Sequence, residues 1–168
     1  MNQTAKEPAR KAERTQILAV DYGRARIGLA IADAATQMPK PLTTLERVNR
    51  NEDMRRLREL VRDHGVKQII VGLPLRLDGT RGEMAEEAER FAQRMMKQVG
   101  VPVEMVDERL TSWEAERLLE EEFGRVSRSG AKSKGAGSSV GGTSVDAMAA
   151  AVILRDYLEQ RRSAGLAE

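Results

Sequence analysis

The chain has 168 residues, of which 40% are hydrophobic, so it can bury one core of ordinary size and is short for two domains. It contains no cysteine and one histidine, which excludes disulfides, thiolate metal sites, a cysteine nucleophile and a metal site built from histidines. The net charge of +2 with a pI of about 9.1 leaves room for local basic patches but does not by itself indicate nucleic-acid binding.

The ends of the chain differ from its middle. Residues 1–15 are polar and charged and lack the apolar stretch of a signal peptide, and no run elsewhere is long enough to span a membrane. We therefore expect a cytoplasmic protein with no membrane partner. The composition predicts a disordered N-terminal tail over 1–15, a single domain over 16–162 with a flexible loop at 124–143, and a C-terminal tail over 163–168.

Five apolar segments have the composition and length of buried strands. The turn Tyr22-Gly23-Arg24-Ala25-Arg26 separates the first two and predicts a hairpin. Proline at positions 39 and 41 enforces an extended connection before the third. The expected strands cover residues 17–20, 27–32, 42–48, 68–73 and 102–106.

Four other segments have the character of helices. The first ends at His64-Gly65, where the glycine predicts a left-handed cap. The third opens on Thr111-Ser112-Trp113-Glu114, which matches a capping box. The expected helices cover residues 51–63, 82–99, 112–123 and 145–161.

This order of elements predicts an α/β fold. Three strands in a meander, followed by strands that alternate with helices, give a mixed five-stranded sheet flanked by helices. Sites in such sheets tend to be built where strands end. Three acidic residues lie at the ends or beginnings of elements: Asp21 ends the first strand, Glu108 follows the fifth, and Asp146 begins the last helix.

Each acid also has an ordinary structural explanation. Asp21 before Tyr-Gly could start a turn, and Glu108 could form a solvated pair with Arg109. The helix dipole favours any aspartate at the position of Asp146. The three together are more informative, because an unpaired carboxylate at the end of an apolar strand needs a partner, a metal or solvent.

If the fold brings the three acids together, they form a carboxylate cluster. Such a cluster can hold Mg²⁺, with Mn²⁺ as the second choice, against a phosphate. Phosphodiester cleavage needs a nucleophilic water and a neutralised leaving oxygen, and two Mg²⁺ ions about 4 Å apart supply both. Without metal, the carboxylates raise one another's pKa by repulsion. The sequence therefore predicts a metal-dependent nuclease.

Basic residues near the acids are candidate contacts to a nucleic-acid backbone. They could hold phosphates or neutralise the acids, and the two roles are compatible. The lysines in the glycine-rich loop could belong to a basic flap or to an ordinary solvated linker. The candidates are Arg24, Arg26, Arg109, Lys132 and Lys134.

Four motifs carry a resemblance to a known family. They are Val20-Asp21-Tyr22-Gly23 with Arg26-Ile27-Gly28, Val71-Gly72-Leu73-Pro74 followed by Gly79, Asp107-Glu108-Arg109-Leu110-Thr111, and Val145-Asp146-Ala147. In these motifs, over residues 16–160, the chain resembles the YqgF/RuvX family of bacterial ribonuclease H-fold proteins, related to the Holliday junction resolvase RuvC.

The resemblance implies a ribonuclease H-like fold, a cytoplasmic location and a nuclease role in maturation of the 5′ end of pre-16S ribosomal RNA. It also implies that Asp21, Glu108 and Asp146 are the catalytic and metal-binding acids, with Asp107 as the substitute if Glu108 points away.

Several alternatives remain open at this point. The substrate could be structured RNA, in ribosomal particles or free, or branched DNA. Asp21-Tyr22-Gly23 also resembles the first phosphate loop of actin-like kinases and ATPases, although those need two such domains to enclose a nucleotide. A fourth alternative is a catalytically silent RNA-binding assembly factor. The oligomeric state, monomer or homodimer, is also left open.

Overall fold

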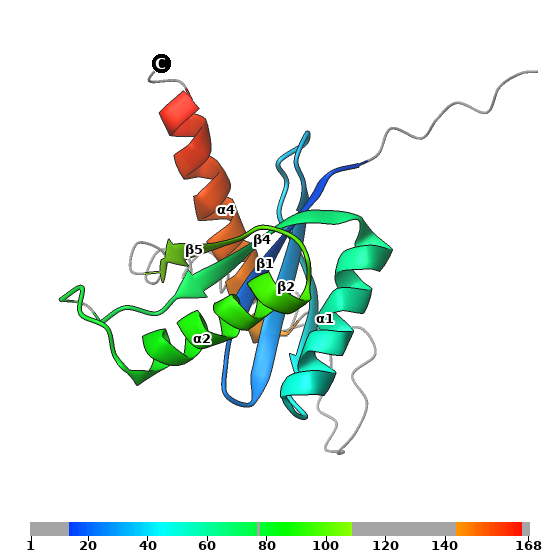
Figure 1. The fold of residues 1–168 in the computed structure, drawn as a ribbon. Coiled ribbons are helices and arrows are strands. Elements are labelled where there is room, and N and C mark those ends of the chain that lie inside the picture. Colours follow the sequence, from blue (N-terminus) through cyan, green and yellow to red (C-terminus); the bar gives the residue numbers. More distant parts are fainter. Residues whose placement is uncertain (1–13, 77, 109–143, 166–168) are drawn as a thin grey trace, which may run out of the picture.

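The computed structural model describes residues 14–76, 78–108 and 144–165 (Figure 1). Most of the expected N-terminal tail, the expected helix at 112–123 and the glycine-rich loop at 124–143 lie outside the described residues. Arg109, Lys132 and Lys134 lie outside them as well. None of the described helices is long and apolar enough to cross a membrane.

The described residues form one mixed five-stranded sheet with helices on both faces (Figure 1). The strand order is β3-β2-β1-β4-β5, in which the first three strands pair antiparallel and β4 and β5 run parallel to β1. This confirms the expected α/β architecture. The elements are β1 (Gln16–Tyr22), β2 (Arg26–Asp33), β3 (Lys40–Glu46), α1 (Arg50–His64), β4 (Val66–Leu73), α2 (Glu83–Gln98), β5 (Val103–Asp107) and α4 (Val145–Gly165).

β3 begins and ends two residues earlier than expected, and α4 continues four residues beyond its expected end at 161, into the segment expected to be a C-terminal tail. The strand includes Pro41, which pairs with Ala30 where the register between β2 and β3 shifts. Proline is tolerated there because β3 is an edge strand and the register is irregular. The chain then turns into α1, whose cap residue Asn49 accepts a hydrogen bond from the Glu52 amide at 2.9 Å.

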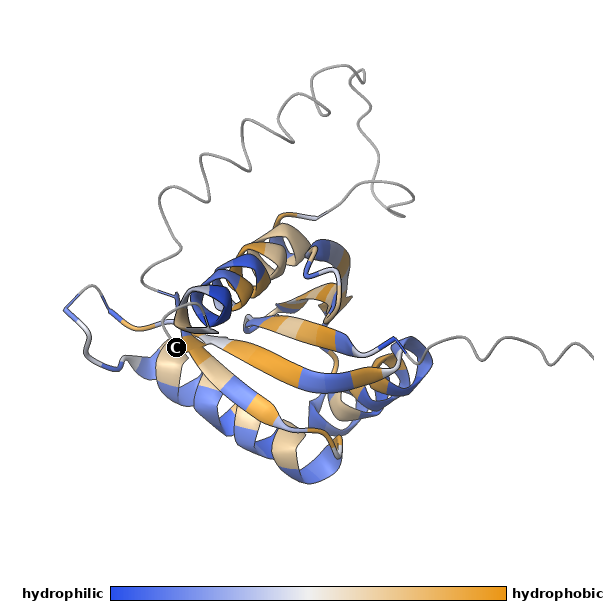
Figure 2. Ribbon diagram, turned by 90° about the horizontal axis from the view of Figure 1, so that it is seen from above, coloured by the Kyte–Doolittle hydropathy of each residue, from blue (hydrophilic) through white to orange (hydrophobic). Residues whose placement is uncertain are grey.

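Each face of the sheet packs against its own helices. Leu18 and Val20 of β1 belong to a core shared with α1 and α2, whereas Ile17 and Ala19 belong to a core shared with α4. Figure 2 shows the hydrophobic strands enclosed between these helices, whose outer surfaces are largely hydrophilic. Because side chains alternate along a strand, Asp21 belongs to the α4 face and Tyr22 to the α1/α2 face.

Candidate active site

Asp21 lies near the end of β1 between two glycines. In the antiparallel ladder its partner is Gly28 of β2. On the other side, Val20 pairs with Val71 of β4, so Gly72 is the next residue along β4. The strands beside Asp21 therefore present no side chain at these two positions on the α4 face.

These glycines make room for the other two acids. A Cβ atom at Gly28 would overlap the backbone carbonyl oxygen of Asp146, and a Cβ atom at Gly72 would overlap the carboxylate of Glu108. The start of α4 thus lies against β2 on one side of Asp21, and the Glu108 side chain lies against β4 on the other. The structure brings the three predicted acids to one end of the sheet.

The titration behaviour of the acids reflects this arrangement. Burial, followed by the nearby charge of Asp146, raises the pKa of Asp21 to about 6. Burial, followed by the charges of Asp21 and Asp107, raises the pKa of Glu108 to about 7. A carboxylate raises the pKa of another only when the two lie within electrostatic reach. The side chains of the three acids are therefore coupled through Asp21.

The position of Asp146 is set by the first turn of α4. The Ser144 hydroxyl accepts a hydrogen bond from the Ala147 amide at 3.2 Å and also bonds to the Thr44 hydroxyl of β3. Arg26 of β2 donates from Nε to the Asp146 carboxylate at 3.0 Å. The helix start is thus attached to both β2 and β3, and Arg26 is a cation at the acid cluster.

The oxygen donors of the cluster have the chemistry that Mg²⁺ prefers. Within the described part of the chain, no three or more His, Cys, Asp or Glu side chains are already grouped so that they could hold a metal ion. Asp146 is instead paired with Arg26. The donor types fit a hard divalent cation, and its capture requires the carboxylates to reorient. Metal binding by Asp21, Glu108 and Asp146 stays a prediction.

Of the predicted cationic contacts, the structure brings Arg26 to the acids and directs Arg24 elsewhere. Arg24 donates from Nη2 to Glu87 of α2 at 2.8 Å and lies 3.4 Å from Glu83. Asp107, the predicted substitute for Glu108, precedes it at the end of β5, while Glu108 lies beside Gly72. Of these two acids, Glu108 is therefore the one whose carboxylate lies against β4 on the α4 face, the face to which Asp21 belongs.

Gly28 and Gly72 lie in two of the sequence motifs, but the close approach of Asp146 and Glu108 to them was not predicted. Glycine inside an apolar strand often marks a close approach of other groups, and this signal was present at both positions. Ser144 was also missed, although a serine just before a helix is a common cap.

The strand order and the packing of α4 against one face define an α/β domain of the ribonuclease H-like type, with acids at the ends of β1 and β5 and at the start of α4. Comparison with known families then identifies the group within this class. The chain belongs to the RuvX family, whose model is described as a Holliday junction resolvase and matches residues 15–160.

Curated relatives are similar over most of their length. A protein of Anaeromyxobacter sp. (strain K) is 44% identical, with 86% of this chain and 96% of the relative covered. One of Chloroflexus aurantiacus is 41% identical, covering 88% of each chain, and one of Gloeothece citriformis is 37% identical, covering 93% and 95%. All three carry the name "Putative pre-16S rRNA nuclease".

Among solved structures, RuvC of T. thermophilus in complex with a Holliday junction substrate is similar in fold. The TM-score is 0.52 at 14% sequence identity, with 88% of this chain and 96% of that chain covered. At this low identity the similarity establishes the common ribonuclease H-like fold.

Proposed function

We propose that this chain is a Mg²⁺-dependent endonuclease that hydrolyses phosphodiester bonds of structured RNA during maturation of the 5′ end of pre-16S ribosomal RNA. The observation that carries the proposal is the electrostatic coupling of Asp21 to Asp146 and of Glu108 to Asp21. Three coupled, partly buried acids on one sheet face suit metal-assisted phosphodiester hydrolysis. The shared name of the relatives supports RNA as the substrate class.

In this proposal Asp21, Glu108 and Asp146 hold the metal through their carboxylate oxygens. When bound, Mg²⁺ makes a coordinated water nucleophilic and neutralises charge on the leaving oxygen. Asp21 and Glu108 must lose their protons for this role, and their raised pKa values reflect how strongly burial and mutual repulsion oppose that loss. Arg26, which pairs with Asp146 at 3.0 Å, would be the cation available to a substrate phosphate if the Asp146 carboxylate held the metal.

Cleavage by an Asp21→Asn variant tests the proposal. Loss of a residue that hydrogen-bonds to a metal ligand typically reduces metal affinity or activity about 10–100-fold. Loss of a direct ligand should therefore reduce cleavage of precursor RNA at least about 100-fold. The matched control is Asp63→Asn, which removes the same charge from an exposed position at the end of α1. Undiminished cleavage by Asp21→Asn would overturn the proposal.

A second measurement separates metal binding from chemistry. A ligand that binds only the folded state raises the unfolding temperature, so Mg²⁺ should stabilise the unmodified protein and the Asp63→Asn control more than Asp21→Asn. Cleavage of a four-way DNA junction is measured in parallel, because the description of the family model favours branched DNA as the second candidate substrate. Binding of RNA without cleavage, unchanged in the amide variants, would instead indicate an assembly factor.

A further inference from the structure

A second charged feature lies on the α1/α2 face of the sheet, behind Asp21. Tyr22, the next residue of β1, lines a cavity of about 270 Å³ at this face. The other residues that line it are dominated by cations. They are Arg47, Arg50, Arg90 and Arg94, together with Glu87 and Phe91. We call this cavity the arginine pocket.

Arg47 lines the arginine pocket and already has its partners. Its Nε donates to the buried carboxylate of Asp53 at 3.1 Å, and its Nη1 donates to the Tyr22 hydroxyl at 2.9 Å. Its guanidinium also lies over the rings of Tyr22 and Phe91, 5.1 and 5.6 Å from their centres. The charge of Arg47 is therefore balanced, and it occupies a face of both rings, which leaves little room for a stacked base.

Glu87, the acid among the lining residues, is also engaged. It accepts hydrogen bonds from Arg24 at 2.8 to 3.1 Å and one from the Tyr22 hydroxyl at 3.2 Å. The hydrogen bond from Arg24 is the main reason why the pKa of Glu87 is lowered, and the charge of Arg90 adds a smaller effect. Glu87 is therefore paired directly with Arg24 and interacts with Arg90 through its charge alone, without an ion pair.

Three arginines of the pocket have no ion pair within the described ranges: Arg50, Arg90 and Arg94. Arg90 and Arg94 are one turn apart on α2, where like charges repel. Arg50 is the first residue of α1, so it lies at the helix N-terminus, where the backbone dipole adds positive potential. A compact anion with several oxygens would relieve this repulsion, and guanidinium groups bind phosphate through paired hydrogen bonds.

We propose that the arginine pocket binds a backbone phosphate of the same RNA molecule whose scissile bond lies at the acid cluster. This inference rests on the proposed function for the identity of the ligand. Asp21 and Tyr22 are consecutive at the end of β1 and belong to opposite faces of the sheet. In this proposal the RNA backbone crosses the turn between β1 and β2 to contact both sites. The pocket would then fix the register of the substrate through its backbone, without reading its bases.

The test compares the salt dependence of RNA binding by two double variants. Arg90→Gln with Arg94→Gln removes two charges from the pocket. Arg58→Gln with Arg62→Gln removes two charges from α1, where neither residue lines the pocket. Binding of a fluorescent RNA fragment that spans the pre-16S 5′ end is measured by anisotropy, with EDTA and without Mg²⁺, between about 50 and 200 mM salt.

Each lost phosphate contact lowers the slope of log K against log salt by about 0.7 to 0.9. The pocket variant should therefore lose about 1.4 to 1.8 of slope if both arginines contact phosphates, and its affinity at low salt should fall at least about tenfold. The control variant should keep its slope within about 0.5 of the unmodified protein.

Equal slopes for the pocket variant and the unmodified protein would overturn the inference, and so would equal losses in the two double variants. Because the binding assay contains no Mg²⁺, its result does not depend on cleavage. Undiminished cleavage by Asp21→Asn would therefore contradict the nuclease proposal independently of the binding result. An unchanged salt slope in the pocket variant, with cleavage intact, would reject the phosphate site in the arginine pocket and leave the nuclease proposal standing. Loss of inorganic phosphate binding in the pocket variant, with RNA binding unchanged, would also count against an RNA contact.

Discussion

The buried position of Asp21 lowers the free energy of unfolding by an amount that depends on pH. Its pKa rises from an ordinary value of 3.8 to about 6. Between these values the folded protein retains a proton that the unfolded chain has released. The free energy of unfolding therefore falls as pH rises through this window, and the loss is complete above the folded pKa. A tenfold change in proton affinity corresponds to about 1.4 kcal/mol, so the full effect is of the order of 3 kcal/mol.

An Asp21→Asn variant should remove this cost, because the amide has nearly the same shape and no charge to lose. We expect its free energy of unfolding at pH 8, measured with urea in the presence of EDTA, to exceed that of the unmodified protein by about 1–3 kcal/mol. At pH 4 the two proteins should differ little. The exposed Asp63→Asn control should show no such gain at pH 8, and an equal gain there would remove the special role of the Asp21 environment.

At the residue scale, the sequence was informative about the acids and less so about the cations. That Asp21, Glu108 and Asp146 meet at one end of the sheet was predictable. All three occupy the ends of elements, and the alternation and order of those elements follow from the apolar pattern. Arg24 and Arg26 could not be told apart in this way. Arg26 lies in β2, where alternation directs it to the α4 face, but Arg24 lies in the turn, where its direction depends on the acids of α2.

At the scale of elements, the approach of α4 to the sheet depends on glycine in β2. Added to Gly28, a Cβ atom would meet the Asp146 carbonyl and, at 3.1 Å, the Ala147 amide nitrogen. Both are backbone atoms in the first turn of α4, so only a shift of the helix relieves the overlap. A Cβ at Gly72 would instead meet the Glu108 carboxylate and, at 2.8 Å, the Cδ1 atom of Ile153, both of which are side-chain atoms.

Gly28→Ala should therefore lower the free energy of unfolding by about 1–3 kcal/mol, the usual cost of overpacking, and reduce cleavage by displacing Asp146. Gly72→Ala should affect cleavage more than stability, because the Glu108 side chain can move away. Urea unfolding and RNA cleavage measured on both variants check this contrast. Gly165→Ala, whose added Cβ meets nothing within 4 Å outside its chain neighbours and its own helix backbone, is the control. A fully stable and active Gly28→Ala protein would contradict the close approach of α4.

The elements themselves were largely predictable from sequence. The left-handed cap at Gly65 is confirmed by its φ of 65°, and the hairpin of β1 and β2 has the expected position. The register between strands was not predictable, because it depends on the geometry of the turn and on packing as well as on the apolar pattern. For the same reason the sequence could not show that Gly28 faces Asp21.

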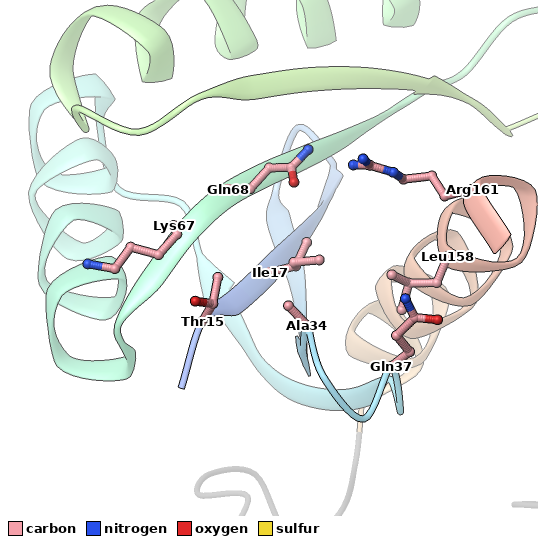
Figure 3. A pocket seen from close by; sticks show the side chains of 8 residues that line it. All are labelled: Thr15, Ile17, Ala34, Gln37, Lys67, Gln68, Leu158 and Arg161. Carbon is pink, nitrogen blue, oxygen red and sulfur yellow. The ribbon is translucent and has the colours of Figure 1, made fainter. Parts of the chain in front are cut away.

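At the scale of the whole molecule, the acid cluster and the arginine pocket lie at one end of β1, and a different polar network lies at the other. Near the start of β1, Ile17, Gln68, Arg161 and other residues line a cavity of about 320 Å³ (Figure 3). The side chains of Gln68 and Arg161 point toward one another across it (Figure 3). Asp21 is four positions beyond Ile17 in β1, a distance of about 13 Å along the strand.

The Tyr157 hydroxyl is the centre of that network. It accepts hydrogen bonds from Gln68 at 2.7 Å and from Arg161 at 2.8 Å, and donates to Glu104 at 2.9 Å. The ring is buried, and loss of the hydroxyl removes all three of these hydrogen bonds, leaving the 3.2 Å hydrogen bond from Gln68 to Glu104 in place. Tyr157→Phe should therefore lower the free energy of unfolding by about 1–2 kcal/mol, measured with urea.

The same variant should cleave RNA at the unmodified rate within about twofold when assayed well below its unfolding temperature, since changes at sites more than about 10 Å apart usually act independently. Asp21→Asn has the opposite signature, because it should raise stability at pH 8 and abolish cleavage. A loss of cleavage in Tyr157→Phe that matches its loss of stability would mean that α4 carries strain from one end of the sheet to Asp146 at the other. The two ends would then act as one unit, and the acid cluster could not be treated as a local site.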